Sequence, residues 1–235
     1  METVPRNKEL RWDTLLTLEE QYAALSELVP VYQKAFAGYP WYEVSKCNCV
    51  RGYSRQKVGE ICTGNPDDAG DTGCGVLLSE EAYPRDELLP ELEQRVRDNP
   101  SLVYVERDED GQAVMGAIAY PAAAKDVYQK KYEDKGRGSE TIETAFSRLP
   151  EKIIWLDEIF ADLERRPSGN LSNFEMICTM MSSQLGNQII AFRTMNEGLI
   201  AKSQSALEAR CAVEWFDDPG VPGKRSALVV INLNQ

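Results

Sequence analysis

Four cysteines gather in a short stretch of the chain, with the spacing C-x-C-x12-C-x11-C. They are Cys47, Cys49, Cys62 and Cys74. Where thiols stay reduced, clustered cysteines are metal ligands more often than disulfide partners. Four thiolates suit tetrahedral zinc, and four protein ligands leave no open position for water or substrate. The pattern therefore predicts a structural zinc knuckle over residues 44–79.

This spacing departs from the regular paired C-x2-C knuckle, so the same cysteines are also compatible with other chemistry. A reduced thiol pair, a labile disulfide, an iron–sulfur site and cysteines without a metal stay open as alternatives. Cys178 falls on the apolar face of a predicted helix, and Cys211 falls in a predicted strand. Both are expected to be small buried hydrophobic residues.

Candidate catalytic groups are limited by the absence of histidine from the 235 residues. A chain without histidine has no Ser-His-Asp triad, no Cys-His pair and no histidine metal ligand. A general base must then be Asp, Glu or a water held by one of them. Asp157 and Glu158 are adjacent carboxylates in the strand-like run 152–163. Because strand side chains alternate, we expect these two to face opposite sides of the sheet.

A glycine-containing turn follows that strand and leads into a helix. Its residues are Arg166, Pro167, Ser168, Gly169, Asn170 and Leu171. A turn of this kind offers unpaired backbone N–H groups and the positive end of the helix dipole. Pyrophosphate is the natural ligand for such a turn.

These groups must be positioned by alternating strands and helices. A first strand is expected over 7–16, a capping box of Thr17 and Glu20 begins a helix, and a second helix follows Pro84. The other expected elements are a hairpin of strands 102–107 and 113–120, a helix from Ser172, a strand over 188–193, a helix capped by Asn196, and final strands over 211–216 and 226–233. Residues 121–150 are expected to form a surface excursion, either a substrate lid or a mobile insertion with no role.

Composition narrows the class of protein. A length of 235 residues with 43% hydrophobic content fits one domain with an insertion. The net charge of -12 argues against nucleic-acid binding and mildly favours a cationic partner, although an acidic surplus is commonly just a solvated surface. The polar N-terminal residues 1–12 and the lack of a run of about 20 apolar residues predict a soluble, cytoplasmic protein without a membrane span.

The succession of elements resembles the GNAT superfamily of N-acetyltransferases throughout, apart from the cysteine insertion and the excursion over 121–150. The resemblance is sharpest at Asp157-Glu158-Ile159-Phe160-Ala161 and at the turn 166–171, which looks like the family's acyl-CoA signature Q/R-x-x-G-x-G/A. It implies a mixed α/β (α+β) fold with a mostly antiparallel central sheet flanked by helices. It also implies an enzyme that moves an acetyl group from acetyl-CoA to a primary amine.

The same resemblance implies the contacts with acetyl-CoA. The backbone of Ile159, Phe160 and Ala161 would pair with the pantetheine arm. Arg166, Ser168, Gly169, Asn170 and Leu171 would line the pyrophosphate, and Asn196 would touch the cofactor.

Acetyl transfer to an amine needs a base, a donor for the developing oxyanion and an acid for the departing thiolate. Glu158 is the expected base, with Asp157 beside it. The alternative is that one of these carboxylates binds a nearby arginine and the other is solvated. A backbone bulge near 159–160 is expected to serve the oxyanion. The tyrosine acid that is frequent in the family has no counterpart, because residues 198–208 contain no tyrosine. Tyr120 is the expected substitute, and departure of an unprotonated thiolate is the alternative.

Two other functions stay open. The tyrosine is missing, Leu171 replaces the small final residue of the signature, and Pro167 removes one backbone donor from the turn. These departures allow a catalytically silent module that binds CoA or a protein partner through the zinc insertion. A zinc-knuckle nucleic-acid module would use the basic residues Lys46, Arg51, Arg55 and Lys57, but the net charge opposes it. The sequence indicates neither the acceptor amine nor the oligomeric state.

Overall fold

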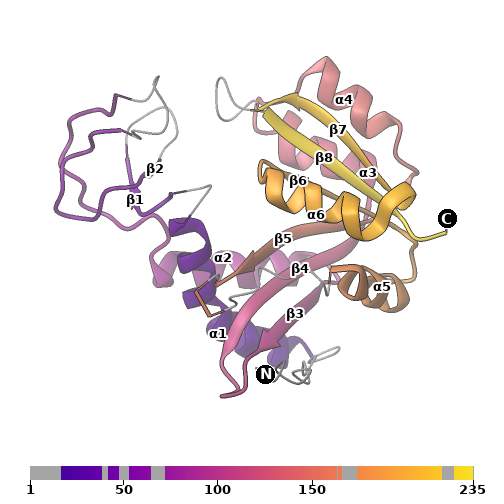
Figure 1. Cartoon of the computed structure of the whole chain (residues 1–235), viewed down its shortest axis with the longest axis horizontal. Helices are drawn as coiled ribbons and strands as arrows, with labels where there is room; N and C mark the ends of the chain where they lie inside the picture. The colour runs from indigo at the N-terminus through magenta and orange to yellow at the C-terminus, as the bar shows by residue number, and fades with distance from the viewer. Residues whose placement is uncertain are drawn as a thin grey trace, which may run out of the picture.

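The computed structural model of the chain describes residues 17–38, 42–47, 53–64, 72–162, 164–165, 174–218 and 225–234. Their central feature is a six-stranded sheet in the order β3-β4-β5-β6-β8-β7 (Figure 1). The strands are β3 (Leu102–Arg107), β4 (Ala113–Ala123), β5 (Lys152–Ala161), β6 (Ile189–Thr194), β7 (Cys211–Asp217) and β8 (Arg225–Asn232). Neighbouring strands are antiparallel except β5 and β6, which are parallel. The predicted mixed, mostly antiparallel sheet is confirmed.

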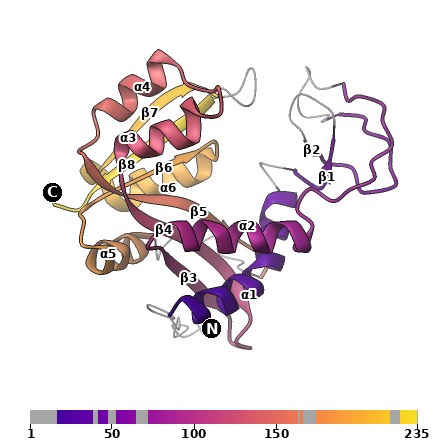
Figure 2. The ribbon, with the colours of Figure 1, turned by 180° about the vertical axis from the view of Figure 1, so that it is seen from behind.

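Helices cover both faces of this sheet. They are α1 (Leu18–Ala37), α2 (Arg85–Asp98), α3 (Ala124–Tyr128), a π-helical turn η1 (Gln129–Glu133), α4 (Glu140–Ser147), α5 (Phe174–Leu185) and α6 (Glu197–Leu207). The pair α1 and α2 and the group α3, η1 and α4 cover separate halves of one face (Figure 2). The pair α5 and α6 covers the opposite face (Figure 1).

Alternation of apolar side chains along the strands accounts for this two-sided packing. In β3, Val103 and Val105 pack with α1 and α2, whereas Leu102 and Tyr104 pack with α5 and α6. Successive side chains of a strand point to opposite faces, so a strand that is apolar at every position is buried on both sides. The sheet is therefore the middle layer of three.

The capping box predicted for the first helix is confirmed. The Thr17 hydroxyl accepts from the Glu20 backbone N–H at 3.3 Å, and the Glu20 carboxylate accepts from the Thr17 backbone N–H at 2.6 Å. The helix continues through Pro30. Pro30 cannot bond the carbonyl of Ser26, and Arg85 of α2 donates to that carbonyl instead, at 3.1 Å.

The segment 121–150, expected as a surface excursion, completes β4 as far as Ala123 and then forms α3, η1 and α4. Within α4, Ile142 and Phe146 lie on one helical face and both side chains are buried. Val127 and Tyr132 are also buried and join the same apolar cluster on the sheet. This segment therefore covers half of one face of the sheet.

The cysteine-containing segment lies between α1 and α2 and extends away from the sheet (Figures 1 and 2). It contains the short antiparallel strands β1 (Ser45–Lys46) and β2 (Tyr53–Ser54). The ring of Tyr53 lies 5.4 Å from that of Tyr83, and Lys46 pairs with Glu87 of α2 at 2.6 Å. These contacts attach the segment to the start of α2.

Other expected elements are found close to their predicted positions. The hairpin is formed by β3 and β4, which pair in antiparallel register. The predicted strand 7–16 lies outside the described residues. In the part of the chain that the structure describes, every helix is too short or too polar to cross a membrane.

Candidate active site

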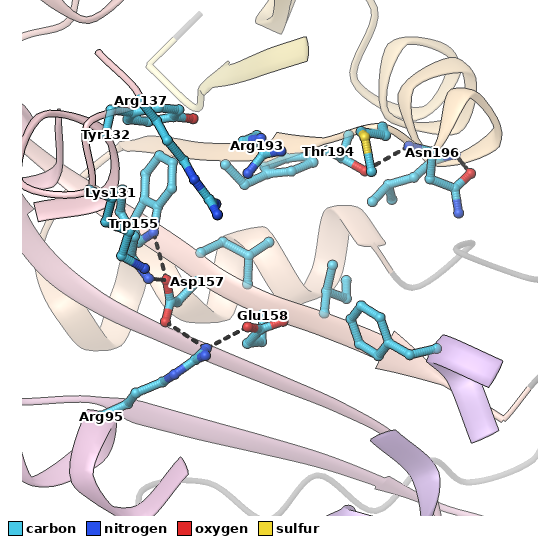
Figure 3. A pocket seen from close by; sticks show the side chains of 17 residues that line it. Arg95, Lys131, Tyr132, Arg137, Trp155, Asp157, Glu158, Arg193, Thr194 and Asn196 are labelled. Atoms are coloured by element: carbon cyan, nitrogen blue, oxygen red, sulfur yellow. Dashed lines mark hydrogen bonds and ion pairs between the residues drawn. The ribbon is translucent and has the colours of Figure 1, made fainter. Parts of the chain in front are cut away.

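The parallel pair at the centre of the sheet opens into a cavity. Strands β5 and β6 pair only where Ile154 meets Ile190 and Trp155 meets Ala191. Beyond these residues the two strands part, and a cavity of about 310 Å³ lies between them and the helices above. Besides Phe36, Leu156, Phe192, Met195 and Leu199, its lining includes ten polar or aromatic side chains that Figure 3 labels: Arg95, Lys131, Tyr132, Arg137, Trp155, Asp157, Glu158, Arg193, Thr194 and Asn196.

A β-bulge in β5 sets the direction of the two acidic side chains. Ile118 of β4 lies opposite Glu158, but Ala119 lies opposite Leu156, so Asp157 is an extra residue in β5. An extra residue breaks the two-residue alternation of a strand. The bulge was expected near residues 159–160 and lies earlier, at Asp157.

Because of this bulge, the two carboxylates lie on the same face of the sheet, and the prediction that they face opposite sides is wrong. Both accept from Nη1 of Arg95, Glu158 at 2.5 Å and Asp157 at 3.4 Å (Figure 3). Arg95 is in α2, so this face is the one that α1 and α2 cover.

Asp157 is the more enclosed of the two carboxylates, with a side chain only 3% exposed. It pairs with Lys131 as well as Arg95, and the indole N–H of Trp155 donates to it at 3.0 Å. Burial alone would raise the pKa of Asp157, but the charges of Lys131 and Arg95 hold it below its usual value. Asp157 is therefore a fixed negative charge.

Glu158 lines the same cavity, with a side chain 17% exposed. Burial raises the pKa of Glu158 against the opposing charge of Arg95, and the neighbouring Asp157 raises it further. Adjacent carboxyl groups with pKa values shifted in opposite directions suit different roles, one as a fixed charge and one as a proton acceptor. The predicted base is thus the carboxylate with the raised pKa.

The three β5 residues predicted to contact the cofactor have different surroundings. Ile159 lines the cavity. Phe160 is buried in the α1 and α2 core, 5.0 Å from the ring of Tyr32, and Ala161 packs against the α5 and α6 core. All three lie on the part of β5 that β6 does not pair with.

Asn196 lies where β6 meets α6. Its side chain accepts from the backbone N–H of Leu199 at 3.1 Å, which confirms that it caps the helix. It also lines the cavity. The other predicted cofactor contacts, Arg166, Ser168, Gly169, Asn170 and Leu171, lie outside the described residues.

Two buried tyrosines lie on this face of the sheet. Tyr120 of β4 pairs in register with Trp155, and burial followed by the charge of Asp157 raises its pKa. Among the described residues, Tyr120 is not part of the cavity lining. Tyr132 does line the cavity, but within the described chain its buried hydroxyl has no hydrogen-bond partner, and burial raises its pKa to about 12.

Comparison with known proteins supports the fold. No protein-family model and no curated protein matches the chain. Among solved structures, Drosophila melanogaster polyamine N-acetyltransferase shares 12% identity, with a TM-score of 0.51 and coverage of 96% of this chain and 100% of that one. Arylalkylamine N-acetyltransferase 2 from Aedes aegypti also shares 12% identity, with a TM-score of 0.52 and coverage of 97% and 100%. The chain has the GNAT fold.

A third structure with this fold, of histone acetyltransferase HPA2 and related acetyltransferase from Corynebacterium glutamicum, shares 13% identity with the chain. Its TM-score is 0.52, and the match covers 96% of this chain and 97% of that one. The likeness to all three structures therefore extends over nearly the whole chain. At such low identities it is a likeness of fold.

Sequence reasoning missed the basic side chains of the cavity. They are Arg95, Lys131, Lys135, Arg137 and Arg193. A signal for Arg95 was present, because it follows the buried Leu88 and Leu92 by seven and three residues and so shares their helical face. The lysines and Arg137 lie in a charged run that has no apolar periodicity, so nothing in the sequence indicated that they face a cavity.

Three of the four clustered cysteines, Cys47, Cys62 and Cys74, lie in the described part of the segment between α1 and α2. The sulfur of Cys47 lies 3.4 Å from that of Cys62 and 3.2 Å from that of Cys74. All three sulfurs lie within 4.8 Å of one another. Cys49, the fourth predicted ligand, is outside the described residues.

The chain can close around these thiols because Gly73 has a φ of 72°. A Cβ at this position would lie 2.3 Å from the backbone nitrogen of Gly64, closer than atoms can approach. Glycine at position 73 thus allows Cys74 to come back beside Cys62.

Replacing Asp157 with Asn should destabilise the fold in a pH-dependent way. Because the folded-state pKa of Asp157 is lowered, its charge contributes stability above its unfolded pKa of about 4, and this contribution is lost as the pH falls through the lowered value. We expect D157N to lower the free energy of unfolding by about 3 kcal/mol at pH 7, since it breaks a buried ion pair. Denaturant unfolding from pH 7 down to pH 3 would measure the difference.

The matched control is D217N at the exposed end of β7, which should change the free energy of unfolding by less than about 0.5 kcal/mol. The difference in the free energy of unfolding between the wild-type chain and D157N should become smaller toward acid pH. A difference that stays constant across this range would show that the charge of Asp157 does not stabilise the fold.

Proposed function

We propose that the chain transfers an acetyl group from acetyl-CoA to a primary amine. The observation that carries this proposal is the parting of β5 and β6 beyond Trp155, with the carboxylate of Glu158 in the opening. An opening of this kind gives an extended ligand access to the backbone of β5, and it places the Glu158 carboxylate, a potential general base, beside that ligand. The GNAT fold and its N-acetyltransferase neighbours support the same reaction.

Acetyl-CoA fits the groups that this opening leaves available. Beyond Trp155 the edge of β5 has no partner in β6, so the backbone of Ile159, Phe160 and Ala161 is proposed to pair with the pantetheine amides. We assign the pyrophosphate to the turn 166–171, ahead of α5, and a further contact to Asn196 at the start of α6.

Glu158 and Tyr120 carry out the two proton transfers. Glu158 accepts the proton that the amine loses as its nitrogen bonds to the acetyl carbon. The bond between that carbon and the CoA sulfur breaks, and Tyr120 donates a proton to the departing sulfur. The backbone N–H of the bulged residue Asp157, which has no partner residue on β4, is the proposed donor to the oxyanion.

The first test is calorimetric titration of the purified chain with acetyl-CoA, followed by an acetylation assay with simple amines. Saturable binding at one site together with amine acetylation is the expected result. Binding without turnover would favour the catalytically silent CoA-binding module. No binding would reject the proposed reaction and leave a GNAT fold adapted to protein interaction.

Replacing Glu158 with Gln should lower kcat by about 100-fold or more, because the amine then loses its proton acceptor. The dissociation constant for acetyl-CoA should stay within about two-fold of the wild-type value, since the substitution is nearly isosteric. Because the pKa of Glu158 is raised, kcat/KM of the wild-type chain should fall as the pH drops through a value above the usual 4.3 or so for a glutamate. This fall should be absent from the residual activity of E158Q.

The matched control is E91Q, because Glu91 also pairs with Arg95, at 2.6 Å, but does not line the cavity. It should keep the wild-type kcat and pH profile. Wild-type turnover by E158Q across the pH range would remove Glu158 from the role of base.

Replacing Tyr120 with Phe tests the proposed acid. Tyr120 lies opposite Trp155, whose indole N–H donates to Asp157, whereas the charges of Arg193 and Asp218 act on Tyr132. Loss of a general acid should lower kcat by about 100-fold. Y132F is the control for loss of a buried hydroxyl in the same cluster, and its kcat should stay within about three-fold of wild type.

Equal effects of the two substitutions would contradict the assignment, because packing would then explain both. An unchanged kcat in Y120F would favour departure of an unprotonated thiolate. Steady-state kinetics with one amine at saturating acetyl-CoA would separate these outcomes.

We also propose that the cysteine insertion holds a structural zinc ion through Cys47, Cys49, Cys62 and Cys74. Zinc–sulfur bonds of about 2.3 Å in a tetrahedron place sulfurs roughly 3.8 Å apart. The observed separations of 3.2 and 3.4 Å are near this value and well above the roughly 2 Å of a disulfide. The three described thiols thus support a shared metal better than a disulfide.

Replacing Cys62 with Ser should reduce the zinc content from one ion per chain to nearly none, because one of the four thiolates is lost. The melting temperature should fall as well, since the insertion loses its cross-link. C211S is the matched control: Cys211 is a half-buried thiol in β7, outside the cluster, and its loss should leave the metal bound. Full zinc content in C62S, measured by elemental analysis, would show that the zinc assignment is wrong.

A further inference from the structure

The candidate active site carries an excess of positive charge. Five basic side chains line the cavity, against two carboxylates, Asp157 and Glu158, so the lining has an excess of three positive charges when all are ionised. The chain as a whole has a net charge of -12. The cavity is therefore positive in an otherwise acidic protein, which marks it as a site for an anion.

The acidic partners of three of these bases are known. Arg95 pairs with both carboxylates, Lys131 pairs with Asp157, and Arg193 pairs with the buried Asp218. Lys135 and Arg137 have no acidic partner within the described part of the chain. Figure 3 shows the side chain of Arg137 reaching into the cavity toward the space above the carboxylate pair. Lys135 and Arg137 are therefore available to bind a ligand.

The positive charges also act on one another. Burial lowers the pKa of Lys135, and the neighbouring charges of Lys131 and Arg137 lower it further. A bound anion would relieve this repulsion, and an arginine beside a lysine can grip a carboxylate or phosphate through charge-assisted hydrogen bonds.

The position of these cations separates them from α5, the helix that follows the segment proposed to bind the CoA pyrophosphate. Arg95 comes from α2, and Lys131, Lys135 and Arg137 come from η1 and the turn after it. Both elements cover the face of the sheet toward which Glu158 points. Helix α5, which follows residues 166–171 in the sequence, covers the opposite face. The cations therefore lie on the side from which an acceptor would meet the base.

We propose that the acceptor is a primary amine that also carries a carboxylate or phosphate group. Arg137 and Lys135 bind this acidic group, and the amine then lies beside Glu158. This inference rests on the proposed acetyl transfer. It replaces the cationic acceptor that the net charge alone suggested, because the surplus acidic residues lie elsewhere on the molecule and the cavity has the opposite sign.

Acceptors that differ only in the acidic group provide the test. The pairs are tyrosine and tyramine, arginine and agmatine, and phosphoethanolamine and ethanolamine, each assayed for kcat/KM with the full chain and saturating acetyl-CoA. We expect a preference of ten-fold or more for the acidic member of at least one pair, the usual range for a charged hydrogen bond. A preference for the non-acidic member in all three pairs would overturn the proposal.

Replacing Arg137 with Gln should raise KM for the preferred acidic acceptor by about 10- to 100-fold and so abolish its advantage over the matched amine. K135Q should act in the same direction with a smaller effect. The control is K125Q, an exposed lysine of α3 away from the cavity, which should keep the wild-type preference. An equal loss with both members of the pair would show that Arg137 does not recognise the acidic group.

A second measurement identifies the source of the anion. The dissociation constant of R137Q for acetyl-CoA should match that of the wild-type chain. A weaker affinity for acetyl-CoA with an unchanged acceptor KM would assign the cations to the CoA phosphates and reject the proposal.

Direct titration with the six amines separates failure of this inference from failure of the proposed reaction. If an acidic amine binds the wild-type chain at least ten-fold more tightly than R137Q but is not acetylated, the anion site stands and the acetyl transfer fails. If amines are acetylated but no acidic member binds more tightly than its partner, acetyl transfer stands and the anion site is rejected. If no acidic amine binds, the inference is overturned regardless of turnover.

Discussion

The site depends on one constraint in the sheet, the parallel contact between β5 and β6 that lasts for two residue pairs and then ends. A sheet loses hydrogen bonds where neighbouring strands part, so the exposed edge needs other partners. Helices on both faces hold the two halves of the sheet, and the opening between them becomes a cavity. The bulge at Asp157 lies at this opening and directs two adjacent carboxylates to the same side.

Charge within the cavity follows from that geometry. Two carboxylates side by side repel each other, and the structure compensates for them with Arg95 and Lys131. Burial raises the pKa of Glu158, which pairs with Arg95, whereas Lys131 and Arg95 together overcome burial and hold the pKa of Asp157 below its usual value. Lys135 and Arg137 add positive charge beyond what the carboxylates need. The same face therefore combines the proposed proton acceptor with the proposed anion site, which is the basis of the proposed amino-acid-like or phosphate-bearing acceptor.

The segment 121–150 and the cysteine-containing segment between α1 and α2 contribute to the molecule in different ways. The first covers the sheet through Tyr132 and Phe146 and brings two lysines and an arginine to the cavity. The second extends from the start of α2 and gathers its thiols around a turn that only glycine at position 73 permits. Acceptor recognition is thus proposed for the first segment, and a structural metal for the second.

The sequence by itself determined the order of helices and strands, the capping residues Thr17 and Asn196, and the closeness of three cysteines, because these depend on periodicity and local hydrogen bonds. It also indicated the acidic pair in β5. Only the tertiary structure decided where these carboxylates point, since one extra residue in a strand reverses every later side chain and leaves no mark in composition. The tertiary structure also decided which basic residues line the cavity, because they come from α2, η1 and β6, which are distant along the chain.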